Sequence, residues 1–377
     1  MHKSKFVLWV ILIIAFGGLA LSLIVFFKWN APLGPSLDMA GYIPETSSIS
    51  ITPTIPPIST EQNSTPNLSG TSTQPAKSAL TATPLPSPAA TSLPKCNGPK
   101  TMTILAIGSD QRGSSYLYGL ADSIYAVYID FTIPKVMIID FPRDLWVEIP
   151  GIADHYGITH GKINQAYLFG NPGMGYYDGP GAGPGLLART LDYDFGLRVD
   201  HYIAIDMQTL VKFVDAVGGV DVQVDSPIDL NYGLDTQDPQ LYLSVGTHHL
   251  DGAHALIMAT NRVPSTFQRQ MYQRMILSAL REKLLSPEMI PQLPGLVTRF
   301  ISSVRTDLSL NDINTLLCIS QAIPDGTIQA ASFPQEMFKA NVTYDQYRKV
   351  TTYTLEADFN EIRAMVAEFM SGIWPFP

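Results

Sequence analysis

Two aspartates stand beside predicted buried strands. The apolar runs at 102–107 and 123–130 are typical of such strands; Asp110 follows the first run and Asp122 directly precedes the second. Carboxylate oxygens are preferred ligands of Mg²⁺, which keeps several waters and is completed by substrate phosphates. The pair therefore indicates either a divalent-cation site or, because aspartate is also a favoured turn and cap residue, ordinary turn structure.

Arginines occupy comparable positions. A third apolar run, at 135–141, is followed by Arg143 and Asp144, and Arg262 and Arg269 lie on either side of a proline break further along the chain. A guanidinium group binds phosphate oxygens in a planar, bidentate geometry, and Asp144 can hold Arg143 in place. Each arginine taken alone is better explained as a surface residue that solvates a helix end. A cation and several arginines together are what pyrophosphate chemistry requires, because they neutralise the transferring and leaving phosphates.

Other chemistries have weaker support in the sequence. The histidines include no His-Glu-x-x-His zinc motif, and the serines include no Gly-x-Ser-x-Gly nucleophile elbow. The glycine-rich stretch at 170–185 lacks the lysine of a phosphate-binding loop and is interpreted as a linker or a lid. With a net charge of −9 and no run of Lys and Arg, the chain is not expected to bind nucleic acid.

The elements that must position these residues alternate between strands and helices. The pattern predicts an α/β domain with a mixed central sheet and helices on both faces, α/β/α. The link "FTIPK" suits a hairpin, Asp251 is placed to cap a helix, and the Ser309–Asp312 spacing is that of a capping box. Predicted helices include 267–285 and the C-terminal "FNEIRAMVAEFMSGI", while the rest of 290–377 has no motif that we can interpret.

The first part of the chain predicts a membrane anchor. Residues 6–27 carry no charge and are long enough to cross a bilayer, so we expect one transmembrane helix after a cytoplasmic tail at 1–5. Lys3 and Lys5 precede the helix and only Lys28 directly follows it, which favours a cytoplasmic N-terminus. The expected location is the cell membrane, with a single pass and the main domain outside the cell.

Residues 28–97 are rich in Ser, Thr and Pro, and this composition predicts a disordered linker between the anchor and a domain at 98–377. The linker is either an O-glycosylated stalk or a plain tether. The chain has two cysteines, Cys96 at the edge of the linker and Cys318 in an apolar helical stretch. Outside the cell they could pair, or Cys318 could be a buried thiol, because pairing cannot be deduced from sequence.

Several stretches resemble the LytR–CpsA–Psr family in the order typical of its members. They are "ILAIGSDQR", "ADSIYAVYID", "FPRDLWVEIPG", "KINQAYLFG", "LRVDHYIAIDMQTLVKFVDAVGGVDVQV" and "GTHHLDGAHAL". The resemblance covers about residues 102–285, most of the outer domain, and the combination is specific where single pieces are not. It identifies residues 98–377 as a LytR–CpsA–Psr-like extracellular domain.

The resemblance implies a cell-wall ligase. Such enzymes move a glycopolymer from a polyprenyl-pyrophosphate carrier onto peptidoglycan, using Mg²⁺ (or Mn²⁺) and an arginine-rich pocket, while an apolar tunnel holds the polyprenyl tail. Carried over by motif, the expected metal ligands are Asp110 and Asp122. The catalytic residues would be Arg143, Arg262, Arg269 and Asp144, and the substrate-binding residues Arg112, Lys162 and Gln273.

This chain also departs from the family pattern. Leu120, Thr260 and Tyr272 stand where the family usually has arginines. Thr266 stands where the family often has an aspartate. Each lost guanidinium removes a charge-assisted contact to phosphate, worth about 1.5–3 kcal/mol. Two hypotheses follow: a divergent, active phosphotransferase, or a catalytically weakened envelope protein that binds polyprenyl phosphate or regulates the wall.

Overall fold

The computed structural model describes residues 28–39, 93–111, 119–232, 237–261, 263, 265–324 and 328–373. The predicted anchor at 6–27, most of the predicted linker, and the site candidates Arg112 and Arg262 lie outside the described residues. Within the described part, none of the helices has the length and apolar character needed to cross a membrane.

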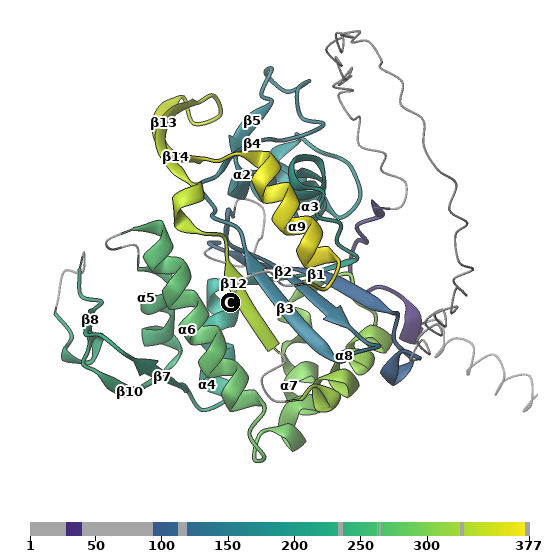
Figure 1. Cartoon of the computed structure of the whole chain (residues 1–377), viewed down its shortest axis with the longest axis vertical. Helices are drawn as coiled ribbons and strands as arrows, with labels where there is room; N and C mark the ends of the chain where they lie inside the picture. The colour runs from purple at the N-terminus through teal and green to yellow at the C-terminus, as the bar shows by residue number, and fades with distance from the viewer. Residues whose placement is uncertain are drawn as a thin grey trace, which may run out of the picture. The chain divides into compact units, whose positions relative to one another are not determined.

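A mixed sheet forms the centre of the described structure (Figure 1). Its six strands run in the order β11-β6-β1-β2-β3-β12. Strand β1 pairs antiparallel with β2 and parallel with β6, β3 pairs antiparallel with β2 and parallel with β12, and β11 pairs antiparallel with β6. The strands are β1 (Thr101–Ser109), β2 (Ala121–Asp130), β3 (Lys135–Asp140), β6 (His201–Asp206), β11 (Arg305–Thr306) and β12 (Ile328–Ser332). The prediction of a mixed central sheet, including the β2–β3 hairpin, is therefore confirmed.

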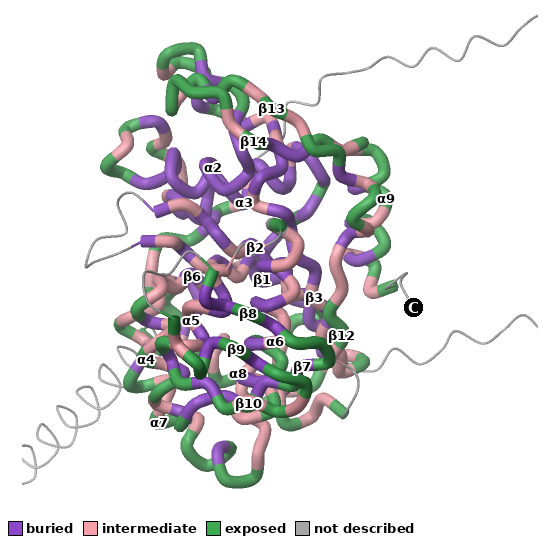
Figure 2. The backbone as a smooth tube through the Cα atoms, turned by 90° about the vertical axis from the view of Figure 1, so that its left-hand side faces the viewer, coloured by how far each residue is buried: buried purple, intermediate pink, exposed green. Residues whose placement is uncertain are grey.

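Helices cover both faces of this sheet. One group consists of α2 (Ile163–Phe169), α3 (Ala182–Phe195) and α9 (Phe359–Met370); the other face carries α7 (Leu293–Phe300) and α8 (Leu310–Ala322). The two faces of the sheet have separate hydrophobic cores, to which β1 contributes alternate residues. Leu105 and Ile107 belong to the first core, and Met102 and Ile104 pack with Leu308 in the second. Many of the buried residues lie in this layered region (Figure 2).

A further group of elements has its own core. Helices α4 (Met207–Ala216), α5 (Gly252–Thr260) and α6 (Thr266–Leu284) pack with the strand pair β7 (Val220–Val224) and β10 (Gly246–Leu250). The small pair β8 (Ile228–Asp229) and β9 (Tyr242–Leu243) joins them. Aspartate side chains cap two of these helices: Asp206 accepts a hydrogen bond from Thr209 N, and Asp251 accepts one from His254 N.

Two short strand pairs lie outside the central sheet. Strands β4 (Trp146–Glu148) and β5 (His160–Lys162) pair antiparallel, as do β13 (Lys339–Asp345) and β14 (Val350–Glu356). The pair β13–β14 and helix α7 lie after residue 290, and no motif in the sequence predicted them. By contrast, α8 begins at the predicted capping box, in which Ser309 and Asp312 exchange hydrogen bonds.

The start of the predicted linker contacts the folded domain. Pro32 forms a bridge with Ser309, Leu33 N donates to Leu308 O at 3.2 Å, and Leu37 is 1% exposed in the main core. A disulfide joins Cys96 to Cys318 in α8, so the question left open by the sequence is settled in favour of pairing. The segments on both sides of residues 40–92 are thus attached to the domain.

Candidate functional site

Asp122 accepts bonds from two arginines. It lies near the start of β2, is 8% exposed, and its Oδ1 forms an ion pair with Nη1 of Arg143, which follows β3. Its Oδ2 lies 3.2 Å from Nη1 of Arg269, which comes from α6. The sheet register brings the first arginine close, whereas the second arrives from 147 residues further along the chain. The result is a buried carboxylate between two guanidinium groups.

A second carboxylate extends this network. Asp144 Oδ1 accepts a hydrogen bond from Lys162 Nζ at 2.9 Å, and its Oδ2 lies 3.4 Å from Arg143 Nε. Burial alone would raise the pKa of Asp144, but the charges of Arg143 and Lys162 outweigh it and lower that pKa. Burial alone would lower the pKa of Arg143, but Asp122 and Asp144 raise it. These opposite shifts favour the charged forms of Arg143 and Asp144 near neutral pH.

Arg269 is the most deeply placed of the arginines described. Its side chain is 1% exposed, which is rare for a residue that is otherwise found at surfaces. Because helix α6 begins at Ser265, whose side chain accepts a hydrogen bond from Gln268 N, Arg269 lies in the first turns of this helix. The guanidinium couples the α4–α6 group to the central sheet through Asp122.

Asp110 lies at the end of β1, beside the start of β2. Its Oδ1 accepts a hydrogen bond from Leu120 N at 2.7 Å, and its own N donates to Leu120 O at 3.0 Å. These bonds close the ends of the stretch 111–119, which contains the undescribed Arg112. Asp110 thus has a local structural role that the sequence had offered as the alternative to metal binding.

The aspartates meet the chemical requirement for a hard cation. Mg²⁺ is commonly held by one or two carboxylates, with waters and phosphate oxygens as the remaining ligands. Asp110 and Asp122 come from the paired ends of β1 and β2, where Ser109 is in register with Ala121. A cation at Asp122 would share the carboxylate with two arginines. Among the described residues, no group of three or more His, Cys, Asp or Glu is arranged to hold a metal.

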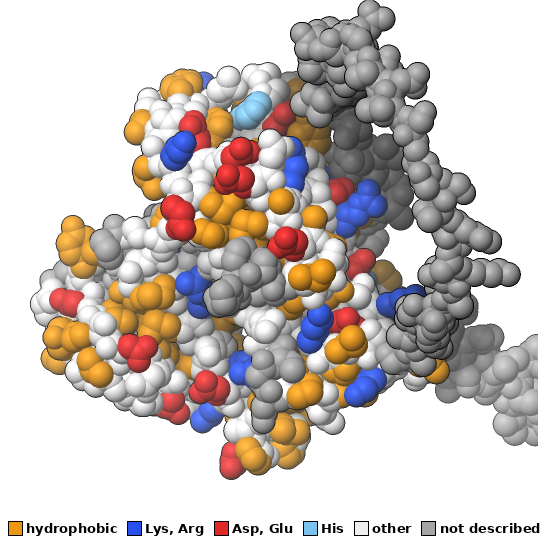
Figure 3. All heavy atoms as spheres, viewed as in Figure 1, with side chains coloured by type: hydrophobic (Ala, Val, Ile, Leu, Met, Phe, Trp, Pro, Cys, Tyr) orange, Lys and Arg blue, Asp and Glu red, His pale blue; other side chains and the backbone are white. Residues whose placement is uncertain are grey.

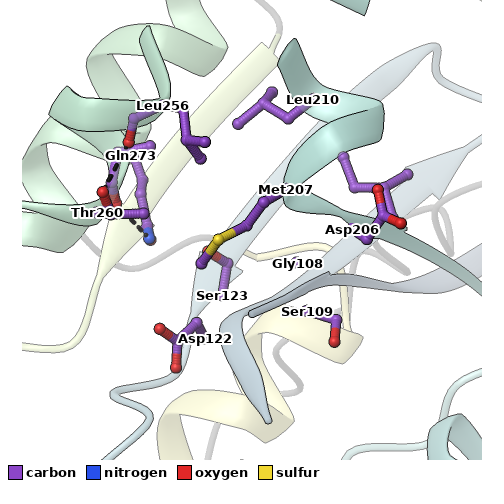
Figure 4. Close-up of a pocket in the computed structure, with 12 residues that line it drawn as sticks. Gly108, Ser109, Asp122, Ser123, Asp206, Met207, Leu210, Leu256, Thr260 and Gln273 are labelled. Atoms are coloured by element: carbon purple, nitrogen blue, oxygen red, sulfur yellow. Dashed lines mark hydrogen bonds between the residues drawn. The ribbon is translucent and has the colours of Figure 1, made fainter. Parts of the chain in front are cut away.

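A cleft of about 380 Å³ lies beside Asp122 (Figure 4). Its polar edge includes Asp122, Ser123 and Gln273, and Met207, Leu210 and Leu256 line the apolar side. Gln273 Nε2 donates to Ala259 O at 3.1 Å, and its Oε1 accepts from the hydroxyl of Tyr125 at 3.4 Å. Gln273 is therefore held at the cleft, as a substrate-binding role would require.

A larger apolar chamber, of about 950 Å³ with the space open to solvent included, lies on the same face of the sheet. Ile205 lines the cleft and Ile203, two residues earlier on β6, lines the chamber. On α4, Leu210 lines the cleft and Phe213 the chamber. The remaining lining comes mostly from α7, α8 and the segment between them: Leu293, Leu296, Val297, Phe300, Ile301, Val304, Thr306, Leu308, Ile313, Leu316, Leu317 and Ser320, with Leu284 from α6.

The structure thus gathers five of the predicted residues and adds one that sequence reasoning missed. Gathered in one ion-pair network are Asp122, Arg143, Asp144, Lys162 and Arg269. The missed residue is Arg274, whose Nη1 lies 3.3 Å from Asp140 at the end of β3. It directly follows Gln273, and the charge of Asp140 within the predicted strand 135–141 was the signal that could have pointed to it.

Comparison with known proteins supports the resemblance found in the sequence. The profile of the LytR_cpsA_psr family matches residues 66–363. The regulatory protein MsrR of Staphylococcus aureus is 28% identical over 213 residues, which is 55% of this chain and 56% of MsrR. A TagU of Enterococcus faecalis, named a polyisoprenyl-teichoic acid–peptidoglycan teichoic acid transferase, is 25% identical over 58% of this chain and 66% of its own length. The matches to these curated relatives span less than two thirds of their length.

Solved structures show the same fold. The crystal structure of Bacillus subtilis TagV aligns with 73% of this chain and 99% of its own, with a TM-score of 0.55 and 23% identity. The structure of TagT bound to LIIa-WTA aligns with 73% of this chain and 91% of its own, with a TM-score of 0.53 and 20% identity. The family profile covers well over half of the residues, from the predicted linker into the first turn of α9. The chain therefore belongs to the LytR_cpsA_psr family.

Proposed function

We propose that the chain is a membrane-anchored phosphotransferase that moves a glycopolymer from a polyprenyl-pyrophosphate carrier onto peptidoglycan outside the cell. The observation that carries this proposal is a buried ion-pair cluster whose Asp122 lines the cleft, with an apolar chamber on the same face of the sheet as the cleft. A lipid-linked pyrophosphate likewise has a charged head and a long apolar tail. The names of relatives such as TagU agree with transfer of this kind.

The arginines would act on the charge of the pyrophosphate. An acceptor hydroxyl oxygen attacks the phosphorus that carries the glycopolymer, a new P–O bond forms, and the bridging P–O bond breaks. Polyprenyl phosphate leaves, and the hydroxyl proton passes to water. Arg143 and Arg269 would neutralise the charge that develops on the transferring and leaving phosphates, and Asp122 would hold both guanidinium groups in position.

The remaining polar groups would orient and complete this site. Lys162 contributes a third positive charge next to Asp144, and Gln273 offers an amide at the cleft. Mg²⁺ or Mn²⁺ would be held by Asp110 and Asp122, and when bound it would polarise the phosphate oxygens. The polyprenyl tail would occupy the chamber, where burial of each CH₂-sized apolar group contributes about 0.8 kcal/mol.

The disulfide supports the proposed location. Disulfides persist in oxidising compartments and are rare in the cytosol. The bond between Cys96 and Cys318 therefore fits a domain outside the membrane, as the distribution of Lys3, Lys5 and Lys28 around the proposed anchor predicts.

The test uses the full chain, purified in detergent. Bound lipid is identified by mass spectrometry, and Mg²⁺-dependent release of polyprenyl phosphate is then measured with a lipid-linked glycan. Arg143→Ala should lower the rate by about 10²–10³-fold, as expected for loss of one preorganised donor. Arg198→Ala is the matched control, because the Arg198 side chain is 73% exposed and lies outside the network. Absence of turnover with a bound lipid would contradict the enzymatic proposal.

That outcome would favour a second function, a polyprenyl-phosphate-binding or regulatory envelope protein. The specific support is the loss of arginines at Leu120, Thr260 and Tyr272, together with the name of the relative MsrR, a regulatory protein. This function predicts that polyprenyl phosphate is retained during purification and that Asp110→Asn leaves the amount of wall glycopolymer in cells unchanged.

A further inference from the structure

The β13–β14 hairpin turns one valine and two tyrosines outward. Val342 is directly opposite Tyr353, and the side chains of Val342, Tyr344 and Tyr353 are 65%, 56% and 45% exposed. On the opposite side, Asp345 is 2% and Thr354 0% exposed, while Val350 near the turn is 46% exposed. A sheet with one face on the protein normally places its apolar residues inward and its polar residues outward. Folding therefore does not explain this pattern, and Figure 3 shows apolar side chains on the surface over the hairpin.

The hairpin is attached to the charged site through hydrogen bonds. Leu355 N donates to the backbone oxygen of Asp144 at 2.9 Å, and Leu355 forms a parallel bridge with Leu145. At the other strand, Asp345 accepts a hydrogen bond from Gln165 Nε2 at 2.8 Å. Gln165 Oε1 in turn accepts from Lys162 N at 2.7 Å. Both strands are thus held to the residues that flank the ion-pair network.

The exposed tyrosine of β14 lies within electrostatic reach of that network. Partial burial, followed by the negative charge of Asp144, raises the pKa of Tyr353. Leu355, two residues further on, is the residue bonded to Asp144, and the period of a strand is two residues. Leu355 is 1% exposed and belongs to the main core, so Tyr353 is the last exposed residue of this face before the buried residues around Asp144.

The composition of this face fits a glycan with anionic groups. Tyrosine presents an apolar ring face, which packs on the C–H face of a pyranose, and a hydroxyl, which can bond to sugar hydroxyls. The turn between the strands carries Arg348 and Lys349, both exposed, in a chain whose net charge is −9. An exposed basic pair at that turn is suited to carboxylates attached to the sugars.

We propose that this face, formed by Val342, Tyr344, Thr351 and Tyr353 with Arg348 and Lys349 at the tip, binds the acceptor, a peptidoglycan glycan strand with its peptide carboxylates. The inference rests on the proposed function for the identity of the acceptor. The sugar rings lie on the tyrosines, and the strand extends from there to Asp144, where an acceptor hydroxyl reaches the pyrophosphate.

The test measures co-sedimentation of the full-length protein, in detergent, with insoluble peptidoglycan sacculi and without any donor lipid. The double variant Tyr344→Ala/Tyr353→Ala should weaken binding at least tenfold, whereas Tyr344→Phe/Tyr353→Phe should retain it because the ring faces remain. Tyr242→Ala is the matched control, since Tyr242 is 56% exposed on β9. Arg348→Glu/Lys349→Glu should weaken binding most at low salt.

The outcomes separate this inference from the proposed function. Polyprenyl phosphate retained during purification, and hydrolysis of donor in the absence of acceptor, should be the same in the double alanine variant as in the unchanged protein. If the unchanged protein shows no transfer but the double alanine variant loses sacculus binding, the result would support the proposed acceptor-binding face and contradict only the proposed phosphotransfer. Unchanged sacculus binding in the double alanine variant would overturn the inference, as would a dimer in sedimentation velocity that this variant abolishes.

Discussion

The cleft and the chamber lie on one face of the sheet but are built in different ways. Around the cleft, charged side chains are fixed by one another: Asp122 is bonded to Arg143 and Arg269, and Asp144 to Lys162. The chamber is lined almost wholly by apolar side chains that leave space between the sheet, α4, α7 and α8. Rigid charge is thus placed where a phosphate would lie, and open apolar volume where a lipid tail would lie.

This difference shows how one face can serve two ends of an amphiphile. Buried ions are costly unless they are paired and hydrogen-bonded, so a charged cluster has to be rigid before a ligand arrives. An apolar cavity pays no such electrostatic cost and can be left open for a ligand that varies in conformation. We therefore expect variants in the two regions to separate stability, head-group binding and tail binding.

The largest effect is expected for Arg269→Ala. Removing this buried guanidinium leaves Asp122 with fewer positive partners, and breaking a buried pair in this way costs about 3–5 kcal/mol of the free energy of unfolding. Chemical denaturation measures the loss. Glu282→Ala, at an exposed position on the same helix, is the control and should change stability by about 0.5 kcal/mol or less. An equal, small change in both variants would contradict a structural role for the ion pair.

The Cys96→Ser/Cys318→Ser variant should have the next largest effect and should act mainly on the chamber. The disulfide joins residues 222 apart, and its removal is expected to lower the free energy of unfolding by about 2–5 kcal/mol. Cys318 belongs to α8, whose residues Ile313 and Leu317 line the chamber, so lipid retention should fall more than binding of inorganic pyrophosphate. Equal losses of both ligands would show that the two regions are not separable.

Val297→Trp should affect the chamber without a large loss of stability. The larger side chain occupies volume that is open in the chamber, and we expect about a tenfold loss of polyprenyl-phosphate affinity, or about 1.4 kcal/mol. The free energy of unfolding should change by less than about 1.5 kcal/mol, because the space is not filled by protein. Thr298→Trp, exposed on the same helix, is the control, and an equal loss of lipid affinity there would show that the chamber is not the site of the tail.

The smallest effect is expected in the pH dependence of the cleft. The pKa of Asp144 is lower in the folded protein than in the unfolded chain, so its ion pairs stabilise the fold above the ordinary aspartate pKa and lose this contribution as the pH falls through the folded value. The free energy of unfolding, measured by denaturation between neutral and strongly acidic pH, should fall less steeply with decreasing pH for Asp144→Asn than for the unchanged protein. Val297→Trp should keep the full slope, because no titrating group changes in the chamber.

Much of the fold could be predicted because its signals are local. Strands β1, β2, β3 and β6 were visible as apolar runs, and α5 and α8 began at the predicted caps Asp251 and Ser309. The site was predicted as a set of residue types, and five of those residues meet. Arg274 and the β13–β14 hairpin were missed. The apolar tunnel that the resemblance implied could not be assigned to residues, since apolar residues that line a cavity do not differ in type from core residues.

Local chemistry in the amino-acid order was enough to establish the alternating strands and helices, the caps, and the presence of acids and arginines suited to phosphate. Such signals act over a few residues, so one sequence displays them directly. Tertiary packing alone decided that Asp122 meets Arg269, that Cys96 reaches Cys318, and that α7 and α8 leave a chamber open. Those contacts join residues far apart along the chain, and their geometry depends on how whole elements pack.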